Sequence, residues 1–408
     1  MNHIPNLFRF LLIMTLFLAF VSPALAAKDS PGYQTGFIRW RAAENGFQGW
    51  ALTRASLAGD GTLNFAPDGE PPETDPYPPD GYYGRNFYNG STYYVGEAVS
   101  PEMPAPFAFT EAIASWNAAT PTGTWIETLM RVQFGSRWSK WYNLGIWAAD
   151  YSTIQRHSVR LQGDADGYVA VDTLVVSAKK TPVSAYQLKV RLFSANESAS
   201  PNVHNLSLAF STSAEKKAVA SSGNPADWNT LLAVPECSQM VYPDGGNVWC
   251  SPTSTSMVLG YWENDTGPCE PRVRAAVDGV YDWVYDGHGN WPFNTAYAAT
   301  HGMEGYVARF TSLTQAEPWI KAGVPVITSI AWGSKDLTGA AVPSSNGHLM
   351  VLVGFDADGN PVLNDPAAAS DEDVQRTYLR SEFEPLWLTS SGGTVYLIYP
   401  VGWAVPEL

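Results

Sequence analysis

The pattern of apolar residues along this 408-residue chain changes near residue 230, and this change constrains the fold more than any other feature. Before it, short runs of Val, Ile, Leu and aromatic residues alternate with polar residues and are separated by turn residues, which is typical of antiparallel strands. The runs lie at residues 36–40, 125–134, 157–162, 168–178, 186–193 and 204–211. They predict an all-β sandwich over residues 31–212.

Beyond residue 230 the apolar spacing first becomes helical and then strand-like. Helical spacing occurs at residues 251–264 and 271–286, and strand-like runs close the chain at residues 347–356, 359–365 and 393–400. Helices that precede strands favour an α+β domain with an antiparallel sheet, which we place at residues 230–404. The small, polar residues 213–229 are predicted to link the two domains. A chain of this length supports a multidomain protein, because it exceeds what one core usually organises.

The first 26 residues have the pattern of a secretory signal peptide. Arg9 precedes an apolar run that is too short to span a membrane comfortably, and Ala24-Leu25-Ala26 forms a small-residue cleavage site. We expect export to an extracellular or periplasmic location, with no membrane span after cleavage; an uncleaved anchor is the alternative. The formal net charge of −15 argues against nucleic acid and anionic membrane surfaces as partners.

The chain contains three cysteines, an odd number. Cysteines of an exported protein tend to pair in oxidising surroundings, and a thiol left over from pairing is a candidate for chemistry. Our hypothesis is a disulfide between Cys237 and Cys269 that leaves Cys250 free.

Cys250 lies where a loop turns into a predicted helix. Gly245 and Gly246 belong to the loop, and Pro252 follows the cysteine in a position that suits the first helical turn. Free amides and the helix dipole at such an end favour an anion and lower the pKa of a thiol. Because the thiolate is the reactive form, Cys250 is the candidate nucleophile; a buried structural cysteine is the alternative.

A general base and a group that orients it are found on two consecutive strands. His348 begins an apolar strand, and the next strand ends at Asp365. A hairpin would carry both residues to the same end of the sheet, although a bulge is needed to bring them into register. Asn364 is the second choice as orienting residue and Asp356 the third. No His/Cys pair has the close spacing of zinc ligands, so no metal or other cofactor is expected.

Gln239 completes the candidate site. It lies on the loop that leads to Cys250, eleven residues before it. A side-chain amide beside the nucleophile's own backbone amide can stabilise a developing oxyanion. A solvated loop glutamine is the alternative interpretation.

The segments VPECSQ, WCSPTSTSMVLGYW, GHLMVLVGFD and NDPA occur in this order and resemble those of the C39-like cysteine peptidases. These are papain-fold relatives of the domains that trim double-glycine leaders from bacteriocins. The resemblance covers about residues 231–400. It implies a papain-like domain with Cys250 as nucleophile, His348 as base, Asp365 as orienting residue and Gln239 as oxyanion donor. The gap from glutamine to cysteine is longer here than in the leader peptidases, and leader processing during transport is not implied.

The first domain resembles the lectin-like β-sandwich found ahead of secreted relatives of that family. Such a domain implies a possible carbohydrate or cell-surface ligand. The candidates for stacking on sugar rings are Trp116, Trp138, Trp141 and Trp147, and a core role is the alternative. Asp164 and Asp166 are weak calcium candidates, because a tight turn explains their spacing better.

These features together predict a secreted cysteine peptidase that hydrolyses peptide or protein substrates. The loops at residues 287–294 and 333–346 are expected to shape its substrate pocket. One alternative is a catalytically silent papain-like domain in a cell-surface or glycan-binding protein. Another is a transglutaminase or amidase that uses the same Cys-His-Asp triad.

Overall fold

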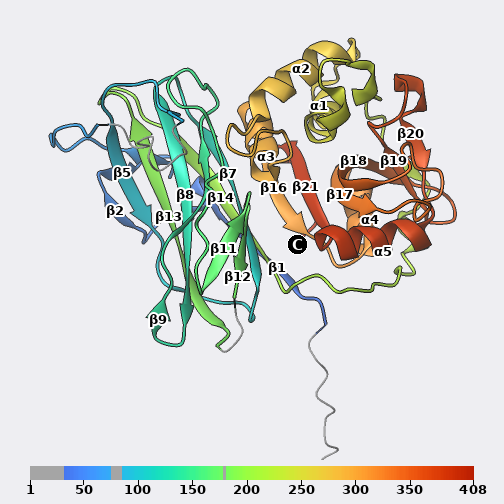
Figure 1. Cartoon of the computed structure of the whole chain (residues 1–408), viewed down its shortest axis with the longest axis horizontal. Helices are drawn as coiled ribbons and strands as arrows, with labels where there is room; N and C mark the ends of the chain where they lie inside the picture. Colours follow the sequence, from blue (N-terminus) through green and yellow to red (C-terminus); the bar gives the residue numbers. More distant parts are fainter. Residues whose placement is uncertain (1–31, 75–84, 178–180) are drawn as a thin grey trace, which may run out of the picture. The chain divides into compact units, whose positions relative to one another are not determined.

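The strand-rich half of the chain forms two antiparallel sheets. A computed structural model describes residues 32–74, 85–177 and 181–408, of which Tyr33–Leu408 form one compact unit; the predicted signal peptide lies outside the described residues. The first sheet has the order β11 (Gly167–Ala170), β12 (Thr173–Val176), β7 (Glu111–Ala119), β14 (Asn202–Ser211), β4 (Leu63–Phe65) and β3 (Ala55–Leu57), and β1 (Thr35–Arg41) also pairs with β14 (Figure 1). The second has the order β10 (Tyr142–Trp147), β8 (Thr124–Phe134), β13 (Val183–Ser194), β5 (Tyr94–Val99) and β2 (Ala51–Thr53), with β6 (Met103–Pro104) on β13 and β9 (Arg137–Trp138) on β8.

The core of this half lies between the two sheets. Apolar side chains of both sheets, such as Trp116 and Leu208 from the first and Met130 and Leu188 from the second, belong to one buried cluster. The alternation of buried and partly exposed residues along β13 explains why its sequence has a period of two.

Two predicted strands of this half differ in the structure. Residues 157–162 form no strand, because only His157 makes a β-bridge, with Ile146. Residues 168–178 are not one strand but the hairpin β11–β12, which turns at Val171 and Asp172. A run of apolar residues has the same period on both arms of a tight hairpin, so the sequence pattern conceals the turn.

The C-terminal half is a mixed structure of one antiparallel sheet and five α-helices. The sheet has the order β16 (Met303–Arg309), β21 (Thr394–Pro400), β17 (Val326–Trp332), β18 (Ser345–Phe355), β19 (Pro361–Asn364) and β20 (Gln375–Thr377), and β15 (Thr230–Leu231) pairs with β18 (Figure 1). The helices are α1 (Cys250–Glu263), α2 (Cys269–Val280), α3 (Trp291–Thr300), α4 (Leu313–Lys321) and α5 (Arg380–Ser391). Short 3-10 turns lie at η1 (Ala42–Glu44), η3 (Pro225–Asp227), η4 (Gln239–Val241), η5 (Gly246–Val248) and η6 (Asp371–Asp373).

Strand β18 is buried on both faces. Leu349 and Val351 pack in a cluster with residues of α1, whereas Met350 and Leu352 pack in a cluster with residues of α4 and α5. Burial on both faces explains why this strand is a continuous apolar run rather than an alternating one.

Three of the helices differ from the sequence pattern. The helix expected at residues 271–286 ends at Val280, and α3 and α5 were not anticipated. Asn290 caps α3 by accepting a hydrogen bond from Phe293, and Pro292 suits its first turn. The expected linker, residues 213–229, is docked on the C-terminal half: Asn224 donates its backbone amide to Glu317, and Trp228 donates its indole N–H to the same carboxylate.

Buried polar contacts join β7 of the first half to β16 of the second. Asn117 donates its side-chain amide to the carbonyl of Gly305 at 2.7 Å, and Ser115 accepts the amide of Val307 at 2.9 Å. Because buried donors and acceptors must find partners, these bonds fix the relation of the two strands. In the part of the chain that the structure describes, no helix is long and apolar enough to cross a membrane.

Candidate active site

Cys250 is the first residue of α1. The chain enters the helix through η5, preceded by Gly245, whose φ of 148° is readily available to glycine. The thiol is partly exposed and is the free one among the cysteines of the described residues. The local sequence therefore sets a thiol at a helix N-terminus, where the peptide dipoles favour a negative charge.

His348 lies near the start of β18 and contacts the carboxylate that the sequence analysis proposed for it. Its Nε2 is 2.7 Å from Oδ1 of Asp365, and both residues are buried. The hydroxyl of Tyr378 donates to the other carboxylate oxygen at 2.7 Å, and the backbone amide of Ala367 donates to Oδ1. Since Nε2 faces Asp365, Nδ1 is the ring nitrogen left for the interaction of His348 with Cys250, which raises the pKa of His348 in addition to the effect of Asp365.

A one-residue bulge brings His348 and Asp365 onto the same face of the sheet. In the β18–β19 ladder Val351 lies opposite Asn364, and the register shifts between Leu352 and Gly354. Continuing the ladder by one residue sets Asp365 opposite Met350, two residues from His348. Without the bulge it would lie opposite Val351, whose side chain points to the other face.

The charges of this cluster support a thiolate and an imidazolium. Burial by itself raises the pKa of the Cys250 thiol, but the hydrogen bond and charge of His348 outweigh it and hold the pKa below its ordinary value. Burial lowers the pKa of His348, but the adjacent Asp365 carboxylate reverses this and leaves the pKa raised. The pKa of Asp365 is likewise lowered: burial alone would raise it, and the charge of His348 prevails.

Gln239 is buried beside the loop that carries Cys250. Its Nε2 donates to the carbonyl of Gly246 at 2.7 Å, which holds the side chain against η5, and its Oε1 has no hydrogen-bond partner. Gln239 lines the same cleft as Cys250 and His348. The bond to Gly246 uses one N–H of the amide.

Asn364 and Asp356, the second and third choices for the orienting residue, form hydrogen bonds with backbone groups instead of with His348. Asn364 donates its side-chain amide to the carbonyls of Val234 and Pro235. Asp356 accepts the backbone amides of Asp358 and Asn360 within the β18–β19 turn. Tyr378, which holds Asp365 from β20's end, escaped the sequence analysis because nothing local connects it with His348.

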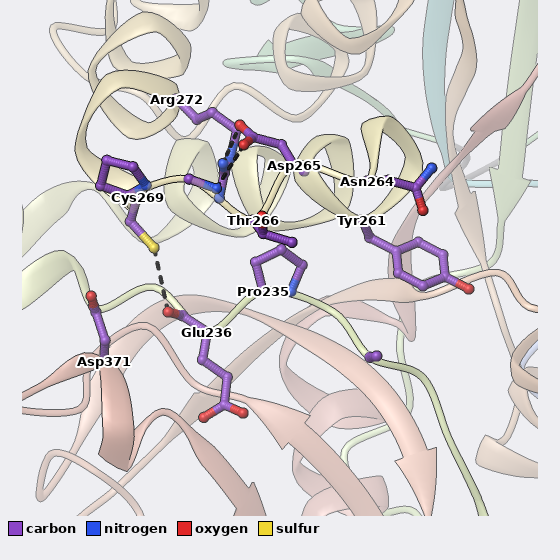
Figure 2. A pocket seen from close by; sticks show the side chains of 13 residues that line it. Pro235, Glu236, Tyr261, Asn264, Asp265, Thr266, Cys269, Arg272 and Asp371 are labelled. Carbon is purple, nitrogen blue, oxygen red and sulfur yellow. Dashed lines mark hydrogen bonds and ion pairs between the residues drawn. The ribbon is translucent and has the colours of Figure 1, made fainter.

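Cys237 and Cys269 form a disulfide that joins the segment before Gln239 to the start of α2. Beside it lies a hollow of about 500 Å³, where Sγ of Cys269 is 3.3 Å from the carbonyl oxygen of Glu236 and Arg272 pairs with Asp265 (Figure 2). Neither Cys250 nor His348 lines this hollow. Its contacts fasten the loop to the helices and bring no nucleophile to it.

Cys250 and His348 line a larger cleft of about 1050 Å³. Both loops expected to shape a substrate pocket contribute to it: Gly287–Gly289 from one and Val342 with Ser344–Asn346 from the other. The first half of the chain also contributes, through Glu111 of β7 and the β11–β12 hairpin. The sequence does not predict this contribution, because a short hairpin carries no signal of the surface against which it packs.

Two matches to known families cover most of the chain. Residues 37–211 match the family described as the Peptidase C39 N-terminal domain, and residues 231–395 match the Peptidase C39-like family. Each half of the chain is thus similar to one domain of C39 peptidases. The resemblance inferred from the sequence motifs is thereby confirmed.

A solved chain described as a candidate C39-like peptidase from Bacillus anthracis is 19% identical to this C39-like protein. The likeness covers 41% of this chain and 96% of that chain, with a TM-score of 0.30, and a likeness of this size carries no part of the argument. No curated protein matches the chain.

The N-terminal half of this C39-like protein does not offer the expected sugar platform. Trp116 and Trp147 are fully buried core residues, so the core role is confirmed for them and stacking on sugar rings is excluded. Trp138 and Trp141 both contact the guanidinium of Arg131, with ring centroids 4.6 Å from it. A carbohydrate ligand therefore has no support here.

Asp164 and Asp166 lie in a tight turn, as their alternative interpretation predicted. Asp164 accepts the backbone amides of Asp166 and Gly167, and Asp166 pairs with Arg137. Within residues 32–74, 85–177 and 181–408, no group of three or more His, Cys, Asp or Glu side chains has the arrangement of a metal site.

Proposed function

We propose that this protein is a thiol peptidase of papain-like design, with Cys250 as nucleophile, His348 as general acid–base and Asp365 as orienting residue. The observation that carries the proposal is the chain of contacts from the thiol through the imidazole to a buried carboxylate. An imidazole between a thiol and a carboxylate is the arrangement that activates a nucleophile and then supplies a proton. Similarity to a peptidase family supports peptides or proteins as the substrate class.

The proposed reaction begins with attack of the Cys250 thiolate on a peptide carbonyl carbon. The C–S bond forms and the carbonyl oxygen takes the electron pair, stabilised by the second N–H of Gln239 and the backbone amide of Cys250. Nδ1 of the His348 imidazolium gives its proton to the leaving amine as the C–N bond breaks. Water, deprotonated by the neutral imidazole, then hydrolyses the thioester and regenerates the thiolate.

Asp365 holds the imidazole in the orientation and tautomer that both steps require. Its carboxylate accepts the N–H on Nε2 and so directs Nδ1 to the sulfur. The hydrogen bonds from Tyr378 and Ala367 hold the carboxylate in place, and its burial keeps water from competing for the imidazole. This support is what a positioned triad requires and what a silent scaffold does not need to keep.

The test combines an active-site probe with peptide cleavage. Iodoacetamide should alkylate Cys250 near neutral pH much faster than it alkylates a free cysteine, because the thiolate is populated there. Cys250→Ala should abolish both alkylation and cleavage of a peptide library with little change in Tm, since it removes only one sulfur atom from a partly exposed residue at the edge of the core. Undiminished cleavage by this variant would overturn the proposal.

Product analysis separates hydrolysis from the related acyl transfer. With a primary amine added to the peptide reaction, a hydrolase releases the free carboxylate as its main product, whereas a transglutaminase gives the amide of the added amine. The outcome decides only how the thioester is resolved, because both reactions use Cys250 in the same way.

We further propose that the protein is exported and that residues 1–26 are removed. The sequence pattern of those residues supports this, and so does a disulfide between Cys237 and Cys269, because such bonds persist in oxidising compartments. N-terminal sequencing of the mature protein should give Ala27 as the first residue. A mature protein that begins at Met1 would contradict it.

A further inference from the structure

The turn of the β11–β12 hairpin has a backbone that its residue type disfavours. Val171 has a φ of 61°, and the amide of Asp172 donates across it to the carbonyl of Ala170 at 2.7 Å. A three-residue turn with positive φ at its centre is rare and strained, and a β-branched residue is the least suited to it. Glycine is the usual residue at such a position. Strain of this kind persists only when the surroundings hold it, and it gathers at functional sites.

A buried carboxylate holds this turn against the C-terminal half. Oδ2 of Asp172 accepts the backbone amide of Trp291, the first residue of α3, at 2.7 Å, and Oδ1 accepts the hydroxyl of Thr173. Asp172 is 5% exposed. Burial raises the pKa of Asp172 to about 7 although the amide of Trp291 acts in the opposite direction, and the hydrogen bond to this amide fastens the hairpin at its tip. The neighbouring Val171 is thereby kept in its strained conformation.

The fastened tip forms part of the cleft that holds the candidate nucleophile. Val171 and Val175 are half-buried, and both line the cleft together with Cys250 and His348. Tyr285 interacts electrostatically with both Asp172 and Cys250. Burial raises the pKa of its hydroxyl, and the charges of these two residues raise it further. The hairpin tip and the thiol therefore line one cleft rather than separate surfaces.

The cleft that the tip lines is suited to an apolar group. Met240, Val248 and Tyr285 line the same cleft and are 44%, 59% and 41% exposed, respectively. Large apolar side chains that remain exposed in a cleft are typical of ligand-binding surfaces, because burying them against a ligand gains free energy. The polar side chains at the tip are already engaged, since Asp172 is bound to Trp291 and Glu111 is paired with Arg309.

We propose that Val171 is a specificity-determining residue, which the N-terminal domain supplies to the active site, and that it contacts an apolar side chain of the peptide substrate. The inference rests on the proposed peptidase function and names a substrate preference for it. The N-terminal domain is then one wall of the substrate cleft. The strained turn is kept because a glycine there would present no side chain to the substrate.

The test compares cleavage of a positional-scanning peptide library by the full-length protein and two variants. Val171→Asp should lower kcat/KM at least 10-fold for peptides with Leu, Val or Phe at one position, and should favour Lys or Arg there instead. Val171→Gly should lower the same apolar preference several-fold. Because glycine relieves the strain, its Tm should equal or exceed that of the unsubstituted protein.

A matched control introduces the same charge elsewhere in the N-terminal domain. Leu161 is 83% exposed and does not line the cleft, so Leu161→Asp should leave the cleavage profile unchanged. Iodoacetamide should alkylate Cys250 at the wild-type rate in all three variants, since none of the substitutions touches the thiol.

The outcomes separate the two proposals. Normal alkylation with an unchanged profile in both Val171 variants would overturn this inference and leave the peptidase function intact. If Val171→Asp fails to fold, the profile of Val171→Gly decides by itself. Absence of both cleavage and alkylation in the unsubstituted protein would remove the proposed function, and this inference with it.

Discussion

The two walls of the cleft are built from different kinds of contact. On the C-terminal wall Asp365 accepts from three donors, which are the imidazole of His348, the hydroxyl of Tyr378 and the backbone amide of Ala367. On the N-terminal wall the cleft is lined by Val171 and Val175, and the carboxylates of Asp172 and Glu111 are bound to a backbone amide and to Arg309, respectively. Under the two proposals above, the C-terminal wall carries the chemistry and the N-terminal wall recognises the substrate. Variants of the first should change the rate for all substrates alike, and variants of the second should change the ranking of substrates.

The largest effect is expected from Asp365→Asn on the C-terminal wall. An amide cannot both accept the N–H on Nε2 and supply negative charge, so kcat/KM should fall on the order of 10³- to 10⁴-fold for every peptide alike. A rate loss confined to some peptides would contradict the proposal that the C-terminal wall acts on all substrates alike. Asp365→Glu is the control that keeps the charge and should recover part of the rate.

Asp365→Asn should also narrow the pH range in which the protein cleaves peptides. In the unsubstituted protein the raised pKa of His348 keeps the imidazolium, and therefore cleavage, until the pH rises through that pKa. The lowered pKa of Cys250 keeps the thiolate, and therefore alkylation, until the pH falls through it. Loss of the carboxylate lowers the first pKa and lets the second rise. Alkylation and cleavage measured as functions of pH should show both limits moving inward; fixed limits would contradict the electrostatic account.

Removal of the disulfide should affect stability more than specificity. The bond between Cys237 and Cys269 closes a separation of 32 residues, which corresponds to about 4 kcal/mol of restricted unfolded-chain entropy. Cys237→Ser with Cys269→Ser should lower the free energy of unfolding in urea by about this amount. The ranking of substrates should stay the same, because the bond lies outside the N-terminal wall. A changed ranking would show that recognition extends to the segment around Gln239.

Gln239→Ala should lower kcat by about 100-fold, since loss of one oxyanion donor typically costs about 3 kcal/mol in the barrier. The expected loss is uniform across peptides, and KM should change little because the donor acts mainly on the transition state. Gln239→Glu offers a comparison of similar shape without the donor. A mainly raised KM would instead identify Gln239 as a substrate-binding residue.

The smallest effect is expected from Tyr378→Phe. The change removes one hydrogen bond to Oδ2 of Asp365, worth about 1.5–3 kcal/mol for a charged acceptor, while the contact of Asp365 with His348 remains. Asp365 should lose part of the lowering of its pKa, because Tyr378 contributes to that lowering. We expect a loss of about 10-fold in kcat with an unchanged ranking of peptides. An effect as large as that of Asp365→Asn would mean that Tyr378 positions the whole cluster.

The sequence was informative where chemistry depends on neighbours along the chain. The Gly-rich loop before Cys250 and Pro252 after it predict a helix start, and the structure begins α1 at that cysteine. Two consecutive apolar strands, the first beginning near His348 and the second followed by Asp365, predict a hairpin. In the structure the side chains of these two residues are in hydrogen-bond contact. Because these relations involve turns, periodicity and helix ends, they follow from local stereochemistry.

Tertiary structure alone decided the relations between distant segments. Tyr378 reaches Asp365 because β20 pairs with β19, and Val171 reaches the cleft because Asp172 binds the first residue of α3. Neither contact has a local signal, since packing selects one partner among many surfaces of similar composition. The sequence by itself determined the family, the order of a strand-rich and a mixed half, and the residues able to carry the chemistry. The bulge that sets the register of His348 and Asp365, and the hairpin that completes the cleft, depend on long-range pairing and burial, which only the folded chain brings about.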